Sequence, residues 1–519
     1  MKKIISLFLG LVIIISSVCI GIPSVSAAQD GSDIPVIHIS GFGSKLTKDN
    51  PDGTKESIYP LQIPDGYIEE KAEEFIPVFA KAFFTQKWDE FCDVLVDILV
   101  PIFEPIALDC NGEASNGSRC EWSWSRKTLR DKKNADGKYP VSAYQFPYDW
   151  RLDPMVIADS LHQYIEDVLY VTGAEKVALF GRCLGSNIVA AYMYKYDGEY
   201  VQEVVHYASA AYGATQCSKA FTGELYMHAD GIERFVYDVD LGLEETYMNL
   251  LQSFVTLFNK TYGLDITCWA INNVVKDIYL DIFPEVMISG FGTFPSYWSM
   301  VSLEDYDRAM ETVFYGSDLN EYAGLIEKIE YYHDNVRLNF EETTKAQMEK
   351  GIEFSNIVKY GIQTIPVTKN SDELSDRTVT VRESSFGATT SEVTKTFSEE
   401  YINNAIANQS AGYISPDRQI DASTCFSPDT TWFIKNLEHN NFPVCVNGLI
   451  SEIINNDNYT VFTSEEYPQY LVFDDETETI SPMTADNLDT TAKWHVSYFE
   501  ALRIFFENLM KIIFEKLSS

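Results

Sequence analysis

A cysteine occupies the centre of a motif that usually carries a serine nucleophile. Residues 181–185 read Gly-Arg-Cys-Leu-Gly, which matches the nucleophile elbow G-x-S-x-G with Cys183 in the serine position. An apolar run over 177–180 precedes the motif and another over 188–194 follows it, as expected for a strand, a sharp turn and a helix. Such a turn presents the side chain at a helix N-terminus, where the backbone dipole favours negative charge. The motif therefore predicts acyl-transfer chemistry with a thiolate nucleophile.

A nucleophile of this kind needs a general base, and His439 is the histidine best placed to supply it. In proteins with this elbow the base follows both the nucleophile and an acid along the chain. His439 lies in the loop after an apolar stretch at 430–435, where the end of a strand would present it to a cleft. His206 falls within a predicted strand and His333 within an acidic helical stretch, so we interpret both as ordinary polar histidines.

The acid that orients the base should precede His439 in a loop after a core strand. Asp417 stands in the turn Ser-Pro-Asp-Arg at 415–418 and is the favoured candidate. Asp421 is its competitor. The alternative is that Asp417 only stabilises this turn and takes no part in catalysis.

The tetrahedral intermediate of acyl transfer needs main-chain N–H donors for its oxyanion. One donor should come from Leu184, the residue after the nucleophile. The other should come from the glycine-rich turn Ser-Gly-Phe-Gly-Ser at 40–44, with Phe42 as the predicted donor.

These side chains must be held by a sheet, and the pattern of the chain predicts a parallel one. Strand patterns alternate with helical ones, which favours an α/β fold with a mostly parallel central sheet and helices on both faces. One helix is well delimited, with Asp153 as N-cap, Pro154 at its first position and Gly173 after its end. Strands are expected at 35–39, 141–146, 176–180, 204–207, 362–368 and 430–435, the last being the final core strand.

Departures from this alternation define the predicted domains. The chain ends in an amphipathic helix whose capping box is formed by Ser497 and Glu500. The predicted segments are a signal peptide (1–27), the first part of the core (28–65 and 139–217), an insertion (66–138), a helical cap (218–355), the second part of the core (356–473), an acidic linker (474–493) and the C-terminal amphipathic helix (494–519).

The composition and charge of the chain limit the partners that it can bind, and its N-terminal pattern indicates the compartment. The 39 basic and 77 acidic residues give a net charge of −38, so nucleic acid is not an expected partner. Lys2 and Lys3 precede an apolar run over 4–22 and small residues before residue 28, the pattern of a secretory signal. A bridge between Cys110 and Cys120 is plausible in a secreted chain. No metal or cofactor is predicted.

Several segments resemble the lecithin:cholesterol acyltransferase-like family of α/β-hydrolases. The segment 39–46 (Ile-Ser-Gly-Phe-Gly-Ser-Lys-Leu) is similar to the family's oxyanion turn, and Pro-Tyr-Asp-Trp-Arg at 147–151 is the most specific match. Phe-Pro-Ser-Tyr-Trp at 294–298 resembles a cap segment of the same proteins. The resemblance covers about residues 34–450, discontinuously.

This resemblance implies an α/β-hydrolase fold and a function. The family transfers an acyl chain from a glycerolipid to an alcohol or to water, so a lipid substrate at a membrane or lipid-particle surface is expected. Cys183, Asp417 and His439 would form the triad, with Phe42 and Leu184 as oxyanion donors. The segment 91–106 would lie in a membrane-contacting subdomain, although a buried core helix explains it equally well.

The chain also departs from the family pattern at its most important position. The family nucleophile is serine, and a histidine usually stands where Arg182 is found. Arg182 and His439 would favour a thiolate at Cys183, and such an enzyme should prefer activated acyl donors. Two other functions remain open: an inactive homologue that binds lipid or another partner, and a cysteine hydrolase of non-lipid substrates. A secreted lipase or O-acyltransferase is the favoured prediction, with its C-terminal helix docked on the protein or associated with a surface.

Overall fold

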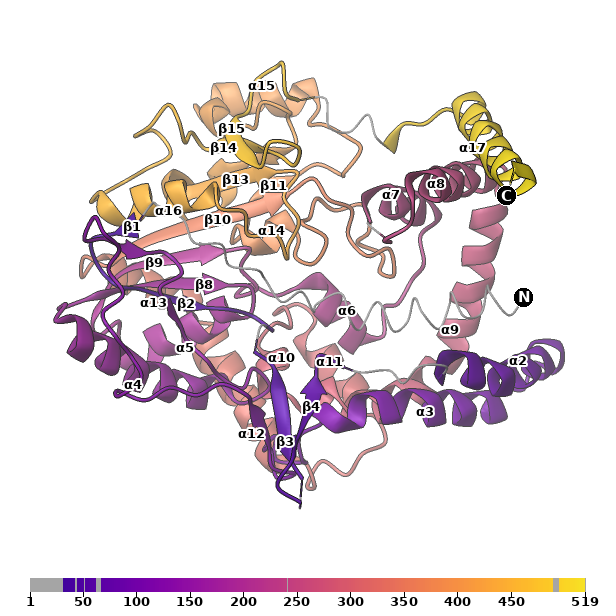
Figure 1. Ribbon diagram of the computed structural model, residues 1–519, viewed down its shortest axis with the longest axis horizontal. Coiled ribbons are helices and arrows are strands. Elements are labelled where there is room, and N and C mark those ends of the chain that lie inside the picture. Colours follow the sequence, from indigo (N-terminus) through magenta and orange to yellow (C-terminus); the bar gives the residue numbers. More distant parts are fainter. Residues whose placement is uncertain are drawn as a thin grey trace.

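Seven parallel strands and one antiparallel edge strand form the largest sheet among the described residues, in the order β15-β14-β13-β10-β9-β8-β2-β7 (Figure 1). The computed structural model describes residues 31–42, 44–50, 52–61, 67–239, 241–488 and 494–518. The predicted signal peptide lies outside these residues. The protein is thus a mixed α/β protein with a mostly parallel central sheet, as the sequence predicted. The strands of this sheet are β2 (Val36–Ile39), β7 (Tyr144–Gln145), β8 (Val177–Arg182), β9 (Val201–Tyr207), β10 (Glu353–Tyr360), β13 (Thr431–Lys435), β14 (Tyr470–Asp474) and β15 (Thr479–Pro482).

Helices cover both faces of this sheet and bury its apolar side chains. Helices α4 (Pro154–Thr172) and α5 (Gly185–Tyr196) share one core with Ile37 and Leu179, while α16 (Val446–Asn455) packs on the other face against Phe180 and Trp432. Helix α4 is capped as predicted, because the Asp153 carboxylate accepts from the amide of Met155 and Gly173 has a φ of 70°. Both faces are therefore buried, which is the usual setting of a parallel sheet.

The remaining elements surround the sheet or form small sheets of their own. The further helices are α6 (Thr215–Thr222), α7 (Ala229–Asp238), α10 (Pro295–Trp298), α11 (Tyr306–Val313), α12 (Ala323–Tyr332), α13 (Phe340–Met348), α14 (Val381–Ser384) and α15 (Glu399–Ala407). The minor strands are β1 (Gly31–Ser32) paired with β6 (Tyr139–Pro140), β11 (Thr389–Thr390) paired with β12 (Ile420–Asp421), and the sheet of β3 (Leu46–Asp49), β4 (Lys55–Tyr59) and β5 (Ser118–Cys120).

Five helices project from one side of the sheet (Figure 1). They are α2 (Tyr67–Thr85), α3 (Asp89–Phe103), α8 (Glu245–Lys260), α9 (Gly263–Ile288) and α17 (Tyr498–Ser518). The apolar face of α3 packs against Ile278 and Ile282 of α9, so the run at 91–106 is largely a packed helix. The C-terminal helix α17 lies along α8. Among the described helices, none has both the length and the apolarity needed to cross a bilayer.

Three details of the predicted sheet are wrong. The residues at 362–368 form no strand of the main sheet, because Gly361 turns the chain with a φ of 88° directly after β10. The strand that was expected there lies earlier, as β10, and its polar residues Ser355, Asn356 and Lys359 hide the strand pattern. The segment at 430–435 is not the last core strand, because β14 follows and pairs with it in parallel. The predicted linker at 474–493 contains β15, which pairs with β14.

Candidate active site

Cys183 lies in a tight turn between β8 and α5, as the elbow motif predicted. Its φ of 53° is in the left-handed region, which is uncommon for a residue with a side chain. Its amide donates to the carbonyl of Tyr207 at 3.1 Å, which ties the turn to β9. Cys183 is 8% exposed. A Cβ on Gly41 would lie 3.3 Å from the Cys183 sulfur, so the glycine-rich turn after β2 closely approaches the nucleophile.

The glycine that closes the elbow allows α5 to pack against the end of β2. A Cβ at Gly185 would lie 1.9 Å from the carbonyl oxygen of Ile39, a distance that no packing adjustment of a side chain could relieve. We therefore expect Gly185→Ala to lower the free energy of unfolding by about 3 kcal/mol or more. Urea denaturation measures this loss. Gly412→Ala is the matched control, because a Cβ there meets nothing within 4 Å. Equal stability of the two variants would contradict the close approach.

The imidazole of His439 is held by Asp376, which the sequence analysis did not select. His439 Nδ1 lies 2.7 Å from Asp376 Oδ2, and both side chains are buried. The other carboxylate oxygen, Oδ1, accepts from the amides of Thr378 at 3.1 Å and Val379 at 2.9 Å. The main chain adds a third link, because the His439 amide donates to the Asp376 carbonyl at 2.9 Å. The acid is thus fully hydrogen-bonded and fixed against the ring.

The predicted pairing of Asp417 with His439 is wrong. Asp417 Oδ2 instead accepts from Lys435 Nζ at 2.7 Å and from the Tyr360 hydroxyl at 3.0 Å. Its competitor Asp421 caps a short 3-10 helix and accepts from the Tyr401 hydroxyl at 2.8 Å. Both aspartates are therefore structural. Asp376 also lies between Cys183 and His439 in the chain, so the order alone could not separate it from Asp417. The position of β10 would have indicated Asp376 as the acid, because this strand ends 16 residues before it.

The third member of the site, Cys183, contacts the ring of His439. Burial alone would lower the pKa of His439, but Asp376 and then Cys183 outweigh it and raise this pKa to about 9. Burial acts in the opposite sense on Asp376, yet His439 and Lys359 keep the pKa of its carboxyl below the usual value. The imidazolium and the carboxylate therefore stabilise each other, and the site favours a charged histidine near neutral pH.

The raised pKa of His439 makes the stability of the fold depend on pH, and the direction of this dependence follows from the shift. A histidine whose folded pKa is about 9 and whose ordinary value is 6.5 stabilises the fold fully below pH 6.5 and loses that contribution as pH rises through 9. We expect the wild-type free energy of unfolding to fall between pH 6.5 and 9.5 by up to about 3 kcal/mol more than that of His439→Gln. Urea denaturation of both proteins at the two pH values measures the difference. Parallel pH profiles would contradict the raised pKa.

Two main-chain amides beside Cys183 are available for an oxyanion. Among the described residues, none accepts a hydrogen bond from the amide of Phe42 or from that of Leu184. Phe42 follows Gly41 in the turn that approaches Cys183, and Leu184 caps the N-terminus of α5. These two amides, the predicted oxyanion donors, thus have no acceptor among the described residues.

The three segments with the family resemblance meet around Phe42. The ring of Phe42 makes an edge contact with Trp150 at a centroid distance of 4.9 Å and lies 6.2 Å from Tyr297. Trp150 Nε1 donates to the carbonyl of Ser44 at 3.0 Å, and the Ser296 hydroxyl donates to the carbonyl of Trp150. The segments at 147–151 and 294–298 therefore fix the turn that carries Phe42.

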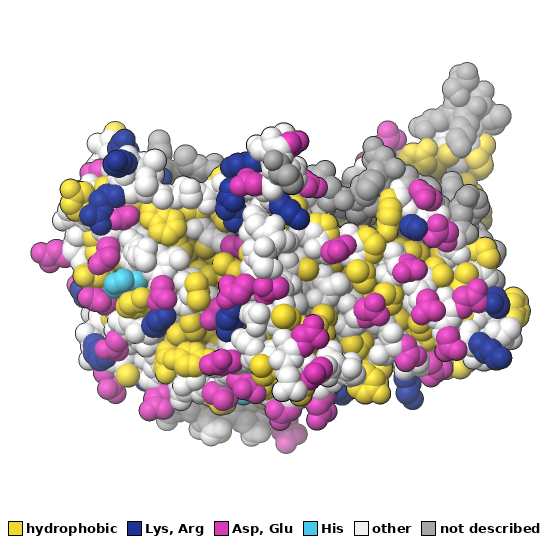
Figure 2. Space-filling model, turned by 90° about the horizontal axis from the view of Figure 1, so that it is seen from below, with side chains coloured by type: hydrophobic (Ala, Val, Ile, Leu, Met, Phe, Trp, Pro, Cys, Tyr) yellow, Lys and Arg dark blue, Asp and Glu magenta, His cyan; other side chains and the backbone are white. Residues whose placement is uncertain are grey.

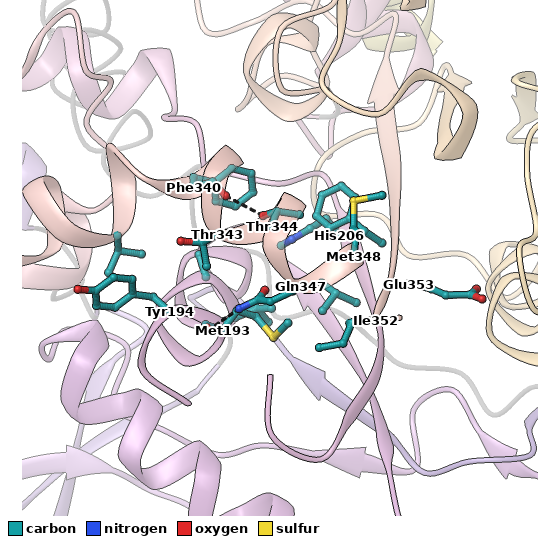
Figure 3. Close-up of a pocket in the computed structure, with 15 residues that line it drawn as sticks. Met193, Tyr194, His206, Phe340, Thr343, Thr344, Gln347, Met348, Ile352 and Glu353 are labelled. Carbon is teal, nitrogen blue, oxygen red and sulfur yellow. Dashed lines mark hydrogen bonds between the residues drawn. The ribbon is translucent and has the colours of Figure 1, made fainter. Parts of the chain in front are cut away.

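Figure 3 shows a small hollow, partly open to solvent, that none of these residues lines. It is lined mostly by α5, α13 and the strands β9 and β10, with Met193, His206 and Phe340 among its walls. His206 is buried there, and burial lowers its pKa to about 3, so the ring is neutral. None of Cys183, Asp376 and His439 lines this hollow.

The remaining described cysteines are not part of this site. Cys110 and Cys120 both carry free thiols, so the plausible bridge between them is not formed. Burial raises the pKa of Cys425 to about 11, as it does for Cys445. Such thiols are poor nucleophiles at neutral pH.

Comparisons of the chain with protein-family models and with curated proteins gave no match. The chemistry of the site must therefore be argued from its own geometry.

Proposed function

We propose that this protein is a thiol-dependent acyl-transfer enzyme of the α/β-hydrolase type, a lipase or O-acyltransferase. The observation that carries the proposal is the chain of contacts from Cys183 to His439 to Asp376 beside the unused amides of Phe42 and Leu184. The strand order, with the nucleophile between β8 and α5, supports the hydrolase fold.

The residues suggest a two-step reaction. The thiolate of Cys183 attacks the acyl carbon, and the amides of Phe42 and Leu184 bind the resulting oxyanion. The imidazolium of His439 gives its Nε2 proton to the leaving alkoxide or thiolate, and an acyl thioester with Cys183 remains. Neutral His439 then takes a proton from water or an acceptor alcohol, which attacks the thioester and releases an acid or a new ester. Asp376 holds the ring throughout and stabilises its charged form.

Protonated His439 offsets a disadvantage of a thiol nucleophile. A thiolate leaves more readily than an alkoxide, so the tetrahedral intermediate from a plain ester tends to collapse back to substrate. A pKa of about 9 keeps the proton on His439 available for the departing alkoxide. We still expect activated donors such as thioesters to react faster, because a thiolate leaves more readily than an alkoxide and depends less on this proton.

The lipid nature of the substrate follows from the family resemblance and is supported by the surface. Large apolar side chains are exposed on the projecting helices, among them Phe254, Trp269 and Phe499. Acidic side chains are spread among apolar ones over the face shown in Figure 2. A chain with a net charge of −38 would favour zwitterionic over anionic lipid. The proposed setting is a secreted enzyme acting at a lipid surface.

Acyl-enzyme trapping tests this function. The protein is mixed with a long-chain acyl thioester, the matching alkyl ester or phosphatidylcholine vesicles, quenched in acid and digested for mass spectrometry. We expect a hydroxylamine-sensitive acyl adduct on the peptide that contains Cys183, formed fastest from the thioester. Release of fatty acid without any adduct on this peptide would overturn the proposal. An adduct from soluble thioesters but never from lipid would favour a cysteine hydrolase of non-lipid substrates.

A further inference from the structure

Three polar side chains form a row across the central sheet behind the candidate site. Arg182 of β8 is paired in register with Tyr207 of β9, and Tyr207 is in turn paired with Ile357 of β10. Lys359 lies two residues beyond Ile357 and so points to the same side of the sheet. The row therefore spans three adjacent strands at their carboxyl ends, immediately next to Cys183.

All three side chains donate to main-chain carbonyls of the loop that carries His439. Arg182 Nη2 reaches the carbonyls of His439 at 3.2 Å and Asn440 at 2.7 Å. Lys359 Nζ reaches those of Glu438 at 2.7 Å, His439 at 2.5 Å and Asn441 at 3.2 Å. The Tyr207 hydroxyl also donates to Asn441, at 3.3 Å. Every carbonyl from residue 438 to 441 is thus bound by a side chain from the sheet.

This use of two buried cations is unusual. Arg182 and Lys359 are 3% and 0% exposed, and neither forms an ion pair with a carboxylate in the described part of the chain. Burial lowers the pKa of Lys359 well below its usual value, with a further contribution from Arg182. Three carbonyl acceptors nevertheless match the three N–H bonds of an ammonium group, whereas a neutral amine has only two. Asp376 and Glu438 act in the opposite sense on the pKa of Lys359, but neither carboxylate forms a direct ion pair with this lysine. Because burying cations without a direct ion pair is costly, their contacts with the loop need a reason beyond packing.

We propose that Arg182 and Lys359 are positioning residues that clamp the His439 loop to the sheet and thereby hold the imidazole against Cys183. The loop is also tied through the His439 amide, which donates to the Asp376 carbonyl, and through Glu438, whose carboxylate accepts from Arg377 Nε at 2.9 Å. The clamp and Asp376 together hold the loop and its ring in place. Small displacements of a catalytic group cost large factors in rate, so the clamp sets how well His439 transfers its proton. This role rests on the proposed function of Cys183.

The test compares Lys359→Gln and Arg182→Gln with Arg182→Lys and with Lys435→Gln. Both bonds of Arg182 to the loop come from Nη2, so lysine is the conservative rescue variant. Lys435 is the matched control, because it is a buried lysine of the next strand, β13, whose ammonium contacts Asp417 and Gln419 instead of the loop. Two quantities are measured: hydrogen exchange of the peptide that covers residues 438–441, and kcat for acyl transfer in wild-type and His439→Ala backgrounds.

We expect Lys359→Gln and Arg182→Gln to speed hydrogen exchange of the loop at least 10-fold and to lower kcat about 10-fold to 100-fold with little change in KM. In the His439→Ala background they should have no further effect on the residual rate, because a clamp acts only through the histidine. Arg182→Lys should recover most of the rate, and Lys435→Gln should leave both the exchange of this loop and kcat within about 2-fold of wild type.

The possible failures can be told apart. Unchanged exchange at 438–441 in both glutamine variants would overturn the clamp, whatever the rates. Equal loss of rate with and without His439 would overturn positioning through the histidine. If Cys183→Ala retained the wild-type rate, the proposed function would fail, and the exchange measurement would still decide whether the two cations hold the loop.

Discussion

Replacing Cys183 by alanine is expected to lower kcat/KM for acyl transfer by a factor on the order of 10⁴ or more. The substitution removes the only protein atom that forms a bond to the acyl carbon in the proposed reaction. Binding of substrate and the oxyanion amides would remain, so KM should change little. Steady-state kinetics with a long-chain acyl thioester measures the loss, and the acyl adduct should disappear from the corresponding peptide.

Cys217→Ala provides the matched control for this experiment. Cys217 is a cysteine with 1% exposure in the same core as Cys183, and it lies in α6. Its replacement by alanine also leaves a small void, so any general effect of losing a buried thiol appears in both variants. We expect Cys217→Ala to keep a rate within about 3-fold of wild type. Similar rates for the two alanine variants would show that Cys183 is not the nucleophile.

The turn that carries Cys183 and the loop that carries His439 could be predicted from the sequence because both depend on local patterns. The elbow is a strand, a turn with required glycines and a helix, all within about 20 residues. The packing requires the second glycine of the motif, since a Cβ at Gly185 would collide with the carbonyl of Ile39. His439 was found in the same way, because it follows the apolar strand β13 by a short loop.

The acid could not be found in this way, because its place depends on a strand that the pattern hides. Strand β10 carries Ser355, Asn356 and Lys359 in its buried interior, and each has a specific partner: Glu203, the carbonyl of Ser384, and the His439 loop. A polar strand of this kind does not look buried in a sequence. The neighbouring apolar run at 362–368 has the pattern of a strand instead. The sequence therefore places the expected acid loop further along the chain than it is.

The sequence pattern predicts neither the role of Lys359 nor that of Asp376, and the reason is the same for both residues. Lys359 interrupts the apolar pattern of β10 because it reaches out to the His439 loop, and Asp376 follows β10 because its loop must meet the same histidine. Local propensity fails here at residues whose partners are distant in the chain, and these are also the residues that build the site. Arg182 shows the same feature inside the elbow, where it stands in place of the histidine found in the resembling family.

The second large expected effect is the loss of kcat when Asp376, the aspartate that contacts His439, is replaced, in contrast to Asp417. Asp376→Asn should lower kcat by about 10³-fold to 10⁴-fold, because an amide cannot stabilise the imidazolium of His439 and leaves its Nδ1 proton without a charged acceptor. The size of the side chain is kept, so the protein should still fold and bind substrate. Kinetics with the acyl thioester and urea denaturation of the same preparation separate the two effects.

Asp417→Asn is the matched variant, and it should show the opposite pattern. Asp417 is a buried carboxylate paired with Lys435, so its loss leaves a buried ammonium group without its counter-ion and should cost about 3 to 5 kcal/mol of stability. The folded fraction should keep kcat within about 2-fold of wild type, because Asp417 makes no contact with His439. An active Asp376→Asn enzyme beside an inactive but folded Asp417→Asn enzyme would contradict the assignment of the acid. The expected result, a stable enzyme without turnover and a fragile enzyme with full turnover, would separate two buried aspartates that the sequence alone cannot distinguish.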